Sequence, residues 1–285
     1  MNSSEIYDEN VTKLLGISPD ICSIGDAETV HEVLVDYNNK QLGCSYMPHY
    51  RGERYFGWDI IPNIFRGVGS NLTSAEGKEN ERKAANQFIK IITESYGDDA
   101  VRRLFDNTSY GKQWNALFQA QHAGIKTTLL DWSARIDRAI YFAVEKDNCF
   151  ERDAGQLWVY LILKQSIVGD CVNELDSYDI KNGMMLNITV DIDDLDKRLW
   201  EKKINNQFGT FYVSACEKCS TAMNQQPEIK PHLFRFRIPA EFKTVIRGDL
   251  DKRNLDWNSI HIKENEPKVQ EIIDSINADA IKKYG

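Results

Sequence analysis

The sequence lacks any apolar run of the roughly eighteen residues that span a membrane as a helix. Its opening segment, MNSSEIYDENVTKLLGISPD, is polar and acidic and has none of the apolar core of a secretion signal. Six cysteines in 285 residues are too few for a disulfide scaffold. We therefore predict a cytoplasmic protein without a membrane partner, whose thiols are mostly reduced.

Clusters of metal-binding side chains are also scarce. Cys216 and Cys219 share a C-x2-C spacing, but Cys171 and His232 lie at no spacing that would complete a zinc site with them. Two free thiols in a loop explain the pair better than a metal does. We predict no metal site.

Positive charge is in deficit. The 35 lysines and arginines are outnumbered by 43 aspartates and glutamates, and the net charge of −8 argues against indiscriminate binding to nucleic acid or anionic membranes. A local basic cluster remains, because Arg51, Arg54 and Arg66 stand among aromatic residues, a pattern typical of single-stranded nucleic-acid binding. Packed aromatic rings beside solvated arginines give the same pattern. Nucleic acid is therefore one candidate partner.

Several common catalytic motifs are missing. The sequence contains no G-x-x-x-x-G-K-[ST], no G-x-G-x-x-G, no H-E-x-x-H and no G-x-S-x-G. Their absence argues against a P-loop kinase, a Rossmann dehydrogenase, a zinc protease of the H-E-x-x-H type and an α/β-hydrolase.

Hydrophobic periodicity predicts helices and strands without a strict β-α-β rhythm. The predicted helices are 28–37, 74–105 (with a short second helix through Val101 and Leu104), 112–123, 138–146 capped by Ser133 or Asp137, a segment after Pro239, and 266–282. The predicted strands are one that ends at Phe65-Arg66-Gly67, then 125–132, 155–163, 208–213 and 233–238. This mixture favours an α+β fold. We place a single domain at 28–285 after an N-terminal extension at 1–27.

Several short sequence motifs, called islands below, follow one another along the chain. They are Phe65-Arg66-Gly67, then Gln121-His122-Ala123-Gly124 with Thr127-Thr128-Leu129-Leu130-Asp131-Trp132-Ser133 and Tyr141-Phe142-Ala143, and finally Gln207-Phe208-Gly209-Thr210-Phe211. Together with the later Ile238-Pro239 and Lys243, they resemble the FRG domain family over roughly residues 45–275. FRG domains in turn resemble distant ADP-ribosyltransferases, which cleave NAD and transfer its ADP-ribose. The resemblance implies a mixed, mostly antiparallel split sheet with flanking helices, and NAD as substrate.

The same resemblance implies roles for individual residues. Arg66 and Gly67 end the first core strand, where the transferases hold the ribose or diphosphate of NAD. The nicotinamide pocket would be formed by Thr127, Thr128, Trp132 and Ser133, with Tyr141 stacked on the nicotinamide ring. Gln207 stands where the transferases carry a catalytic Glu on a late strand, so the sequence departs from the family pattern there.

The chemistry of the reaction gives roles to four residues independently of the resemblance. Cleavage of the nicotinamide glycosidic bond passes through an oxocarbenium-like ribose, which needs a negative or strongly dipolar group nearby. Asp131 is the best carboxylate for that task, and the planar guanidinium of Arg66 suits a diphosphate. His122 can hold a ribose hydroxyl or move a proton near neutral pH. A neutral Gln207 can orient a ribose hydroxyl or an acceptor.

Each of these residues has a structural alternative. Arg66 can pair with a buried carboxylate such as Asp131 and fix the core, and His122 can cap the end of its helix. Trp132 and Tyr141 can be core residues, Thr127 and Thr128 ordinary strand residues, and Gln207 part of a bulge.

We therefore expect an intracellular NAD-dependent ADP-ribosyltransferase, of the kind used as a bacterial or phage toxin or defence effector. Its acceptor would be nucleic acid or protein, and a neutralising antitoxin protein is a candidate partner. One alternative is a non-enzymatic module that binds a nucleotide or a partner with the same pocket. Another is an RNA-cleaving enzyme based on His122, for which the sequence offers no second acid–base group.

Overall fold

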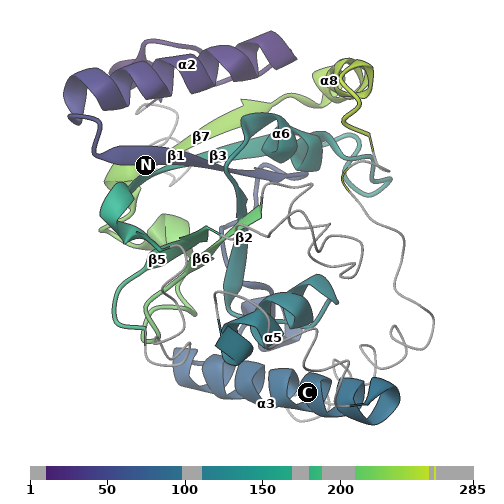
Figure 1. Ribbon diagram of the computed structural model, residues 1–285. Coiled ribbons are helices and arrows are strands. Elements are labelled where there is room, and N and C mark those ends of the chain that lie inside the picture. The colour runs from purple at the N-terminus through teal and green to yellow at the C-terminus, as the bar shows by residue number, and fades with distance from the viewer. Residues whose placement is uncertain (1–10, 98–110, 169–179, 188–208, 257–259, 261–285) are drawn as a thin grey trace.

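The computed structural model describes residues 11–97, 111–168, 180–187, 209–256 and 260 (Figure 1). The helices are a π-helical turn at Val11–Leu15, α2 (Ile24–Gln41), α3 (Ser74–Tyr96), α5 (Gly111–His122), α6 (Ile136–Val144) and α8 (Ala240–Lys252), with short 3₁₀ turns at Asn63–Phe65, Gly67–Gly69, Lys164–Ser166, Met223–Gln225 and Lys230–His232. The strands are β1 (Tyr46–Glu53), β2 (Leu129–Ser133), β3 (Gly155–Leu163), β4 (Ile167–Val168), β5 (Met184–Asn187), β6 (Gly209–Val213) and β7 (Leu233–Ile238). The predictions for Gln207, for the short helix through Val101 and Leu104 and for the closing helix at 266–282 lie outside the described residues.

The strands form one open sheet of seven strands in the order β4-β5-β6-β2-β1-β3-β7. Neighbouring strands run antiparallel, except that β4 and β5 are parallel. The predicted α+β fold with a mixed, mostly antiparallel sheet and flanking helices is therefore confirmed.

The sheet has a weak junction between β1 and β2. These two strands share a single register pair, Tyr50 with Ser133. By contrast, β1 is paired with β3 along its whole length, and β2 with β6 along its whole length. The junction divides the sheet into a half formed by β7, β3 and β1 and a half formed by β2, β6, β5 and β4.

The helices cover the two halves separately, as Figure 1 shows. α2, α6 and α8 pack against β1, β3 and β7 through one core cluster, which contains Leu34, Ile140 and Val159. α5 packs on β2 and β6 through another, where the Phe118 and Phe211 rings stack with centroids 4.9 Å apart. α3 packs on α5. Among the described residues, no helix is both long and apolar enough to cross a membrane.

The strand predicted to end at Phe65-Arg66-Gly67 is wrong. Two short 3₁₀ turns, Asn63–Phe65 and Gly67–Gly69, occupy that stretch, and the first core strand is β1, which ends earlier at Glu53. The apolar run Ile60, Ile61, Ile64 and Phe65 has the composition of a strand, although its residues pack from a loop. The arginine carried by the first core strand is therefore Arg51, not Arg66.

Two predicted helix starts also move. The boundary placed after residue 27 lies inside α2, which begins at Ile24 because Ser23 and Asp26 form a reciprocal capping box. For α6 the N-cap is Arg135, without a side-chain cap, instead of Ser133 or Asp137. The Ser133 hydroxyl does contribute nearby, because it accepts a hydrogen bond from the Arg135 backbone N at 3.1 Å.

Gly52 lies where β1 passes closest to α6. A Cβ atom at this position would lie 1.7 Å from the carbonyl oxygen of Ala139 and 2.8 Å from the backbone N of Ala143. We expect Gly52→Ala to lower the free energy of unfolding by about 2–3 kcal/mol, because the backbone of a packed helix must shift. Urea unfolding followed by circular dichroism measures the change.

Gly248→Ala is the matched control, because a Cβ at Gly248 in α8 would meet no atom within 4 Å. Alanine there should stabilise the helix by up to about 1 kcal/mol. A Gly52→Ala protein as stable as the wild type would contradict the close approach of β1 and α6.

Candidate functional site

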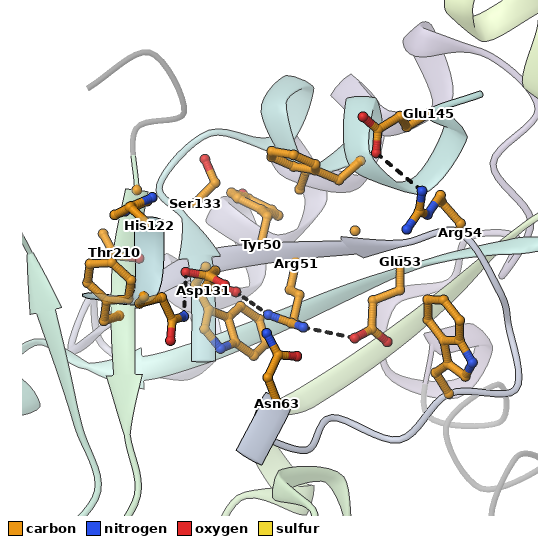
Figure 2. A pocket seen from close by; sticks show the side chains of 18 of the residues that line it. Tyr50, Arg51, Glu53, Arg54, Asn63, His122, Asp131, Ser133, Glu145 and Thr210 are labelled. Carbon is orange, nitrogen blue, oxygen red and sulfur yellow. Dashed lines mark hydrogen bonds and ion pairs between the residues drawn. The ribbon is translucent and has the colours of Figure 1, made fainter. Parts of the chain in front are cut away.

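A cavity of about 320 Å³ opens at the junction between the two halves of the sheet (Figure 2). Its walls come from β1, the chain around Asn63, the end of α5, β2, α6 and β6. The charged residues that line it are Arg51, Arg54, Arg66, Glu53, Asp131 and Glu145. The cavity is therefore rich in charge of both signs, with residues brought together from distant parts of the sequence.

Each residue of the Phe65-Arg66-Gly67 segment has a different structural role. Phe65 is buried, with its ring so close to Gly77 of α3 that a Cβ there would come within 2.3 Å of it. Gly67 has a φ of +59°, in the left-handed region that glycine enters without strain. Arg66 donates from Nε to the carbonyl oxygen of Ile61 at 2.9 Å. The segment thus anchors the loop, directs the arginine and turns the chain.

Arg66 pairs with Glu53 inside the cavity. Its Nη2 lies 3.5 Å from Glu53 Oε1, and the Arg66 side chain is 34% exposed whereas that of Glu53 is 3% exposed. Burial and the neighbouring charge of Arg51 lower the pKa of Arg66, while the Glu53 carboxylate acts in the opposite direction. The structural alternative, in which Arg66 pairs with a buried carboxylate, is therefore present, but the partner is Glu53 and not Asp131. Because an arginine stays charged even so, Arg66 presents a fixed cation to the cavity.

Glu53 is the buried acceptor beneath two arginines. Arg51 donates from Nε to Glu53 Oε1 at 3.0 Å, and Gln156 of β3 donates from Nε2 to Oε2 at 2.6 Å. Gln156 also donates to the carbonyl oxygen of Trp58 at 2.8 Å. A buried carboxylate requires such partners, and these hold Glu53 in place.

Asp131 stands in the middle of β2 and is exposed. Its backbone oxygen accepts a hydrogen bond from Arg51 Nη1 at 2.6 Å, which ties β1 to β2 next to their single register pair. Its carboxylate Oδ1 accepts from Gln121 Nε2 at 2.9 Å. Figure 2 shows Asp131 between Arg51 on one side and His122 and Thr210 on the other.

The far end of the cavity is formed by Arg54 and aromatic rings. Arg54 Nη1 lies 2.8 Å from Asp147 Oδ2 and 3.7 Å from Glu145 Oε2. Trp58 and Phe142 also line the cavity, and aromatic side chains of this kind can pack against a planar ligand.

The structure brings many of the predicted site residues together. Those that line the cavity are Arg66, His122, Asp131, Trp132 and Ser133. The His122 ring meets Phe211 edge-on, with centroids 5.6 Å apart. Trp132 is buried and belongs to a core cluster as well, so for this residue the structural alternative and the cavity wall coexist.

Thr127 and Thr128 do not line the cavity. Both are buried, and they support β2 from the side of α5 and α3. Thr127 donates from Oγ1 to Gln121 Oε1, and the Thr128 backbone N donates to Glu81 Oε2. Their contribution to this site is therefore indirect, in contrast to the nicotinamide contact that the sequence implied.

Tyr141 and Gly67 are also absent from the cavity wall. Tyr141 lines a separate cavity beside α8, and burial raises its pKa. Phe142, the next residue of α6, occupies the place in the wall that was predicted for Tyr141. The residue predicted as the late-strand group, Gln207, lies outside the described residues, although Gly209 and Thr210 shortly after it line the cavity.

The predicted pair of free thiols is confirmed at Cys216 and Cys219. The Cys216 sulfur accepts from the Ile180 backbone N at 3.2 Å, and burial raises the pKa of Cys219. Within the described part of the chain, no cluster of three or more His, Cys, Asp and Glu side chains could hold a metal ion.

Sequence reasoning missed three residues of the site and undervalued a fourth. Glu53 was not considered, and Arg51 was weighed only as a contact for nucleic acid. Their spacing of two along a strand, which puts both on one face, was the available signal. Gln121 belonged to a recognised island without a role of its own. Thr210 likewise belonged to the last of these islands without a role of its own, since threonine is common in strands.

Comparison with known proteins finds a family match for part of the chain. The sequence profile of the FRG domain family matches residues 47–152. That range contains the Phe65-Arg66-Gly67 island and the islands around Gln121 and Asp131, and it supplies all the residues that line the cavity except Gly209, Thr210 and Phe211. A search of curated proteins and a search of solved structures each found no match. Residues 47–152 are therefore similar to the FRG domain family.

Proposed function

We propose that this protein is an ADP-ribosyltransferase with NAD as its substrate. The observation that carries the proposal is the convergence of Arg66 and Asp131 on one cavity, beside His122. A diphosphate is bound best by a fixed cation, and a developing oxocarbenium ion is stabilised by a nearby anion. The cavity offers both groups at one place.

In the proposed reaction the bond between ribose C1′ and nicotinamide N1 breaks, and its electron pair leaves with neutral nicotinamide. The Asp131 carboxylate stabilises the positive charge that develops on the ribose. An oxygen or nitrogen of the acceptor then bonds to C1′, and its proton passes to His122. Arg66 holds the diphosphate throughout.

The size of the cavity restricts how NAD is placed. About 320 Å³ lies at the lower end of the range of roughly 300–1,000 Å³ for ligand pockets. We therefore assign the cavity to the nicotinamide riboside end, with the diphosphate at Arg66. Trp58 and Phe142 offer the aromatic faces against which nicotinamide stacks.

The acceptor belongs to one of two classes, nucleic acid or protein. Purified protein, NAD labelled on the adenylate phosphate and a cell extract are incubated together. One portion of the products is then digested with nuclease and another portion with protease. Label released by only one digestion identifies the acceptor class. An activity of this kind in the cytoplasm would be toxic, which is why we include a toxin or defence role and a neutralising antitoxin in the proposal.

Arg66→Ala tests the binding part of the proposal. Loss of a charge-assisted contact, worth about 1.5–3 kcal/mol, should raise the Kd for NAD about 10- to 100-fold. Isothermal titration calorimetry measures the Kd. Arg82→Ala is the matched control, because Arg82 lies on α3, pairs with Glu79 there and does not line the cavity. Equal affinity of folded Arg66→Ala and Arg82→Ala proteins would remove Arg66 from the NAD site.

A second candidate function is a module that binds a nucleotide without cleaving it. The neutral Gln207, at the position where the resemblance calls for a catalytic Glu, favours it. This candidate predicts that NAD and ADP-ribose raise the melting temperature while no nicotinamide is released. Release of nicotinamide that depends on Asp131 would exclude it.

A further inference from the structure

A chain of hydrogen bonds reaches the Asp131 carboxylate from the buried side of β2. Thr127 Oγ1 accepts from the Leu129 backbone N at 3.2 Å and also contacts Gln121 Oε1. At its other end, the Gln121 side chain donates from Nε2 to Asp131 Oδ1 at 2.9 Å. The chain thus links a buried threonine, the last turn of α5 and the carboxylate of the cavity.

The Thr127 hydroxyl and the Asp131 carboxylate together set the direction of these bonds. A hydroxyl group has one hydrogen and accepts through its oxygen. Since the Thr127 oxygen already accepts from Leu129 N, its hydrogen is available for Gln121 Oε1. The amide then turns its NH₂ group toward Asp131, and an ionised carboxylate can only accept. The reversed amide would bring two acceptor oxygens together at Asp131.

Burial makes this arrangement hard to replace. Thr127 is 1% exposed, so water cannot substitute for its hydroxyl without penetrating the core. In the described part of the chain, no group donates a hydrogen bond to Asp131 Oδ2. One oxygen of the carboxylate is therefore held by Gln121, and the other is left for a ligand in the cavity that Asp131 lines.

We propose that Gln121 is a positioning residue whose amide, oriented by Thr127, holds the Asp131 carboxylate against the ribose of NAD. This inference rests on the proposed transferase function and deepens it. It links the motif that contains Gln121 to the motif that contains Thr127 and Asp131, because their side chains form one hydrogen-bonded chain. Gln121 acts on the reaction only through Asp131.

The test compares two substitutions of Thr127. Thr127→Val keeps the branched shape and removes the hydroxyl, whereas Thr127→Ser keeps the hydroxyl. We expect Thr127→Val to lower kcat for nicotinamide release about 10-fold, with the KM for NAD changed less than two-fold. Thr127→Ser should restore kcat to within two-fold of the wild type. Wild-type kcat in folded Thr127→Val, or failure of the serine variant to restore kcat, would overturn the positioning role.

A measurement without turnover separates this inference from the proposed function. The side-chain amide resonances of Gln121, assigned by their loss in Gln121→Glu, should shift in Thr127→Val and Asp131→Asn and stay unchanged in Arg82→Ala. If they shift as expected but the wild type releases no nicotinamide, the transferase function fails while the hydrogen-bond chain stands. If they do not shift in Thr127→Val, the chain itself is refuted whatever the activity.

Discussion

Asp131→Asn is expected to lower kcat for ADP-ribosyl transfer at least 100-fold while NAD still binds. Loss of one group that stabilises charge in a transition state costs about 10²–10³ in rate. The substitution removes charge and little else, because an Asn oxygen can still accept from Gln121 and the backbone bond to Arg51 is unchanged. The fold should therefore survive, and the loss should appear in the chemical step.

The rate of nicotinamide release at saturating NAD measures this effect, with the Kd for NAD determined in parallel. Asp36→Asn is the matched control, since Asp36 is an exposed residue of α2 paired with Lys40. A destabilised but fully active Asp131→Asn protein would show that the carboxylate has a structural role. A stable variant that no longer binds NAD would move Asp131 from catalysis to binding.

The elements that the sequence predicted well are those set by local pattern. β3 is found at the predicted residues, where a short, continuous apolar run is typical of a strand that is buried on both faces. β7 is also found as predicted. In contrast, the segment that ends at Arg66 has the composition of a strand but joins none of the strands that the structure describes. Its conformation depends on Phe65 packing against α3, which is a tertiary contact.

The sequence predicted which segments form the site, but it did not predict which side chains contact one another there. Arg66 contacts Glu53 instead of Asp131 because of the register of the strands: β1 pairs with β3 along its whole length but shares only one register pair with β2. Local sequence does not encode that register. The exchange of Tyr141 for Phe142 has a similar cause. Neighbouring residues of a helix point in directions about 100° apart, so the wall residue depends on how α6 is rotated about its axis.

Glu81→Leu should destabilise the protein more than Gly52→Ala does. Glu81 of α3 is fully buried, lies 3.1 Å from Lys78 Nζ and accepts from the Thr128 backbone N at the approach to β2. Glu81→Leu would leave the buried Lys78 ammonium without this partner. We expect a loss of about 3–5 kcal/mol in the free energy of unfolding, measured by urea denaturation.

The double variant Lys78→Met, Glu81→Leu separates the two tasks of Glu81. Replacement of a buried ion pair by apolar residues of similar volume is often nearly neutral. The double variant should therefore recover most of the stability that Glu81→Leu loses, apart from the roughly 1–3 kcal/mol of an unsatisfied backbone N at Thr128. If instead it is as unstable as Glu81→Leu, the hydrogen bond to Thr128 carries the effect. In that case α3 stabilises the site through the backbone of the segment that leads to Asp131, and the charge of Lys78 matters little.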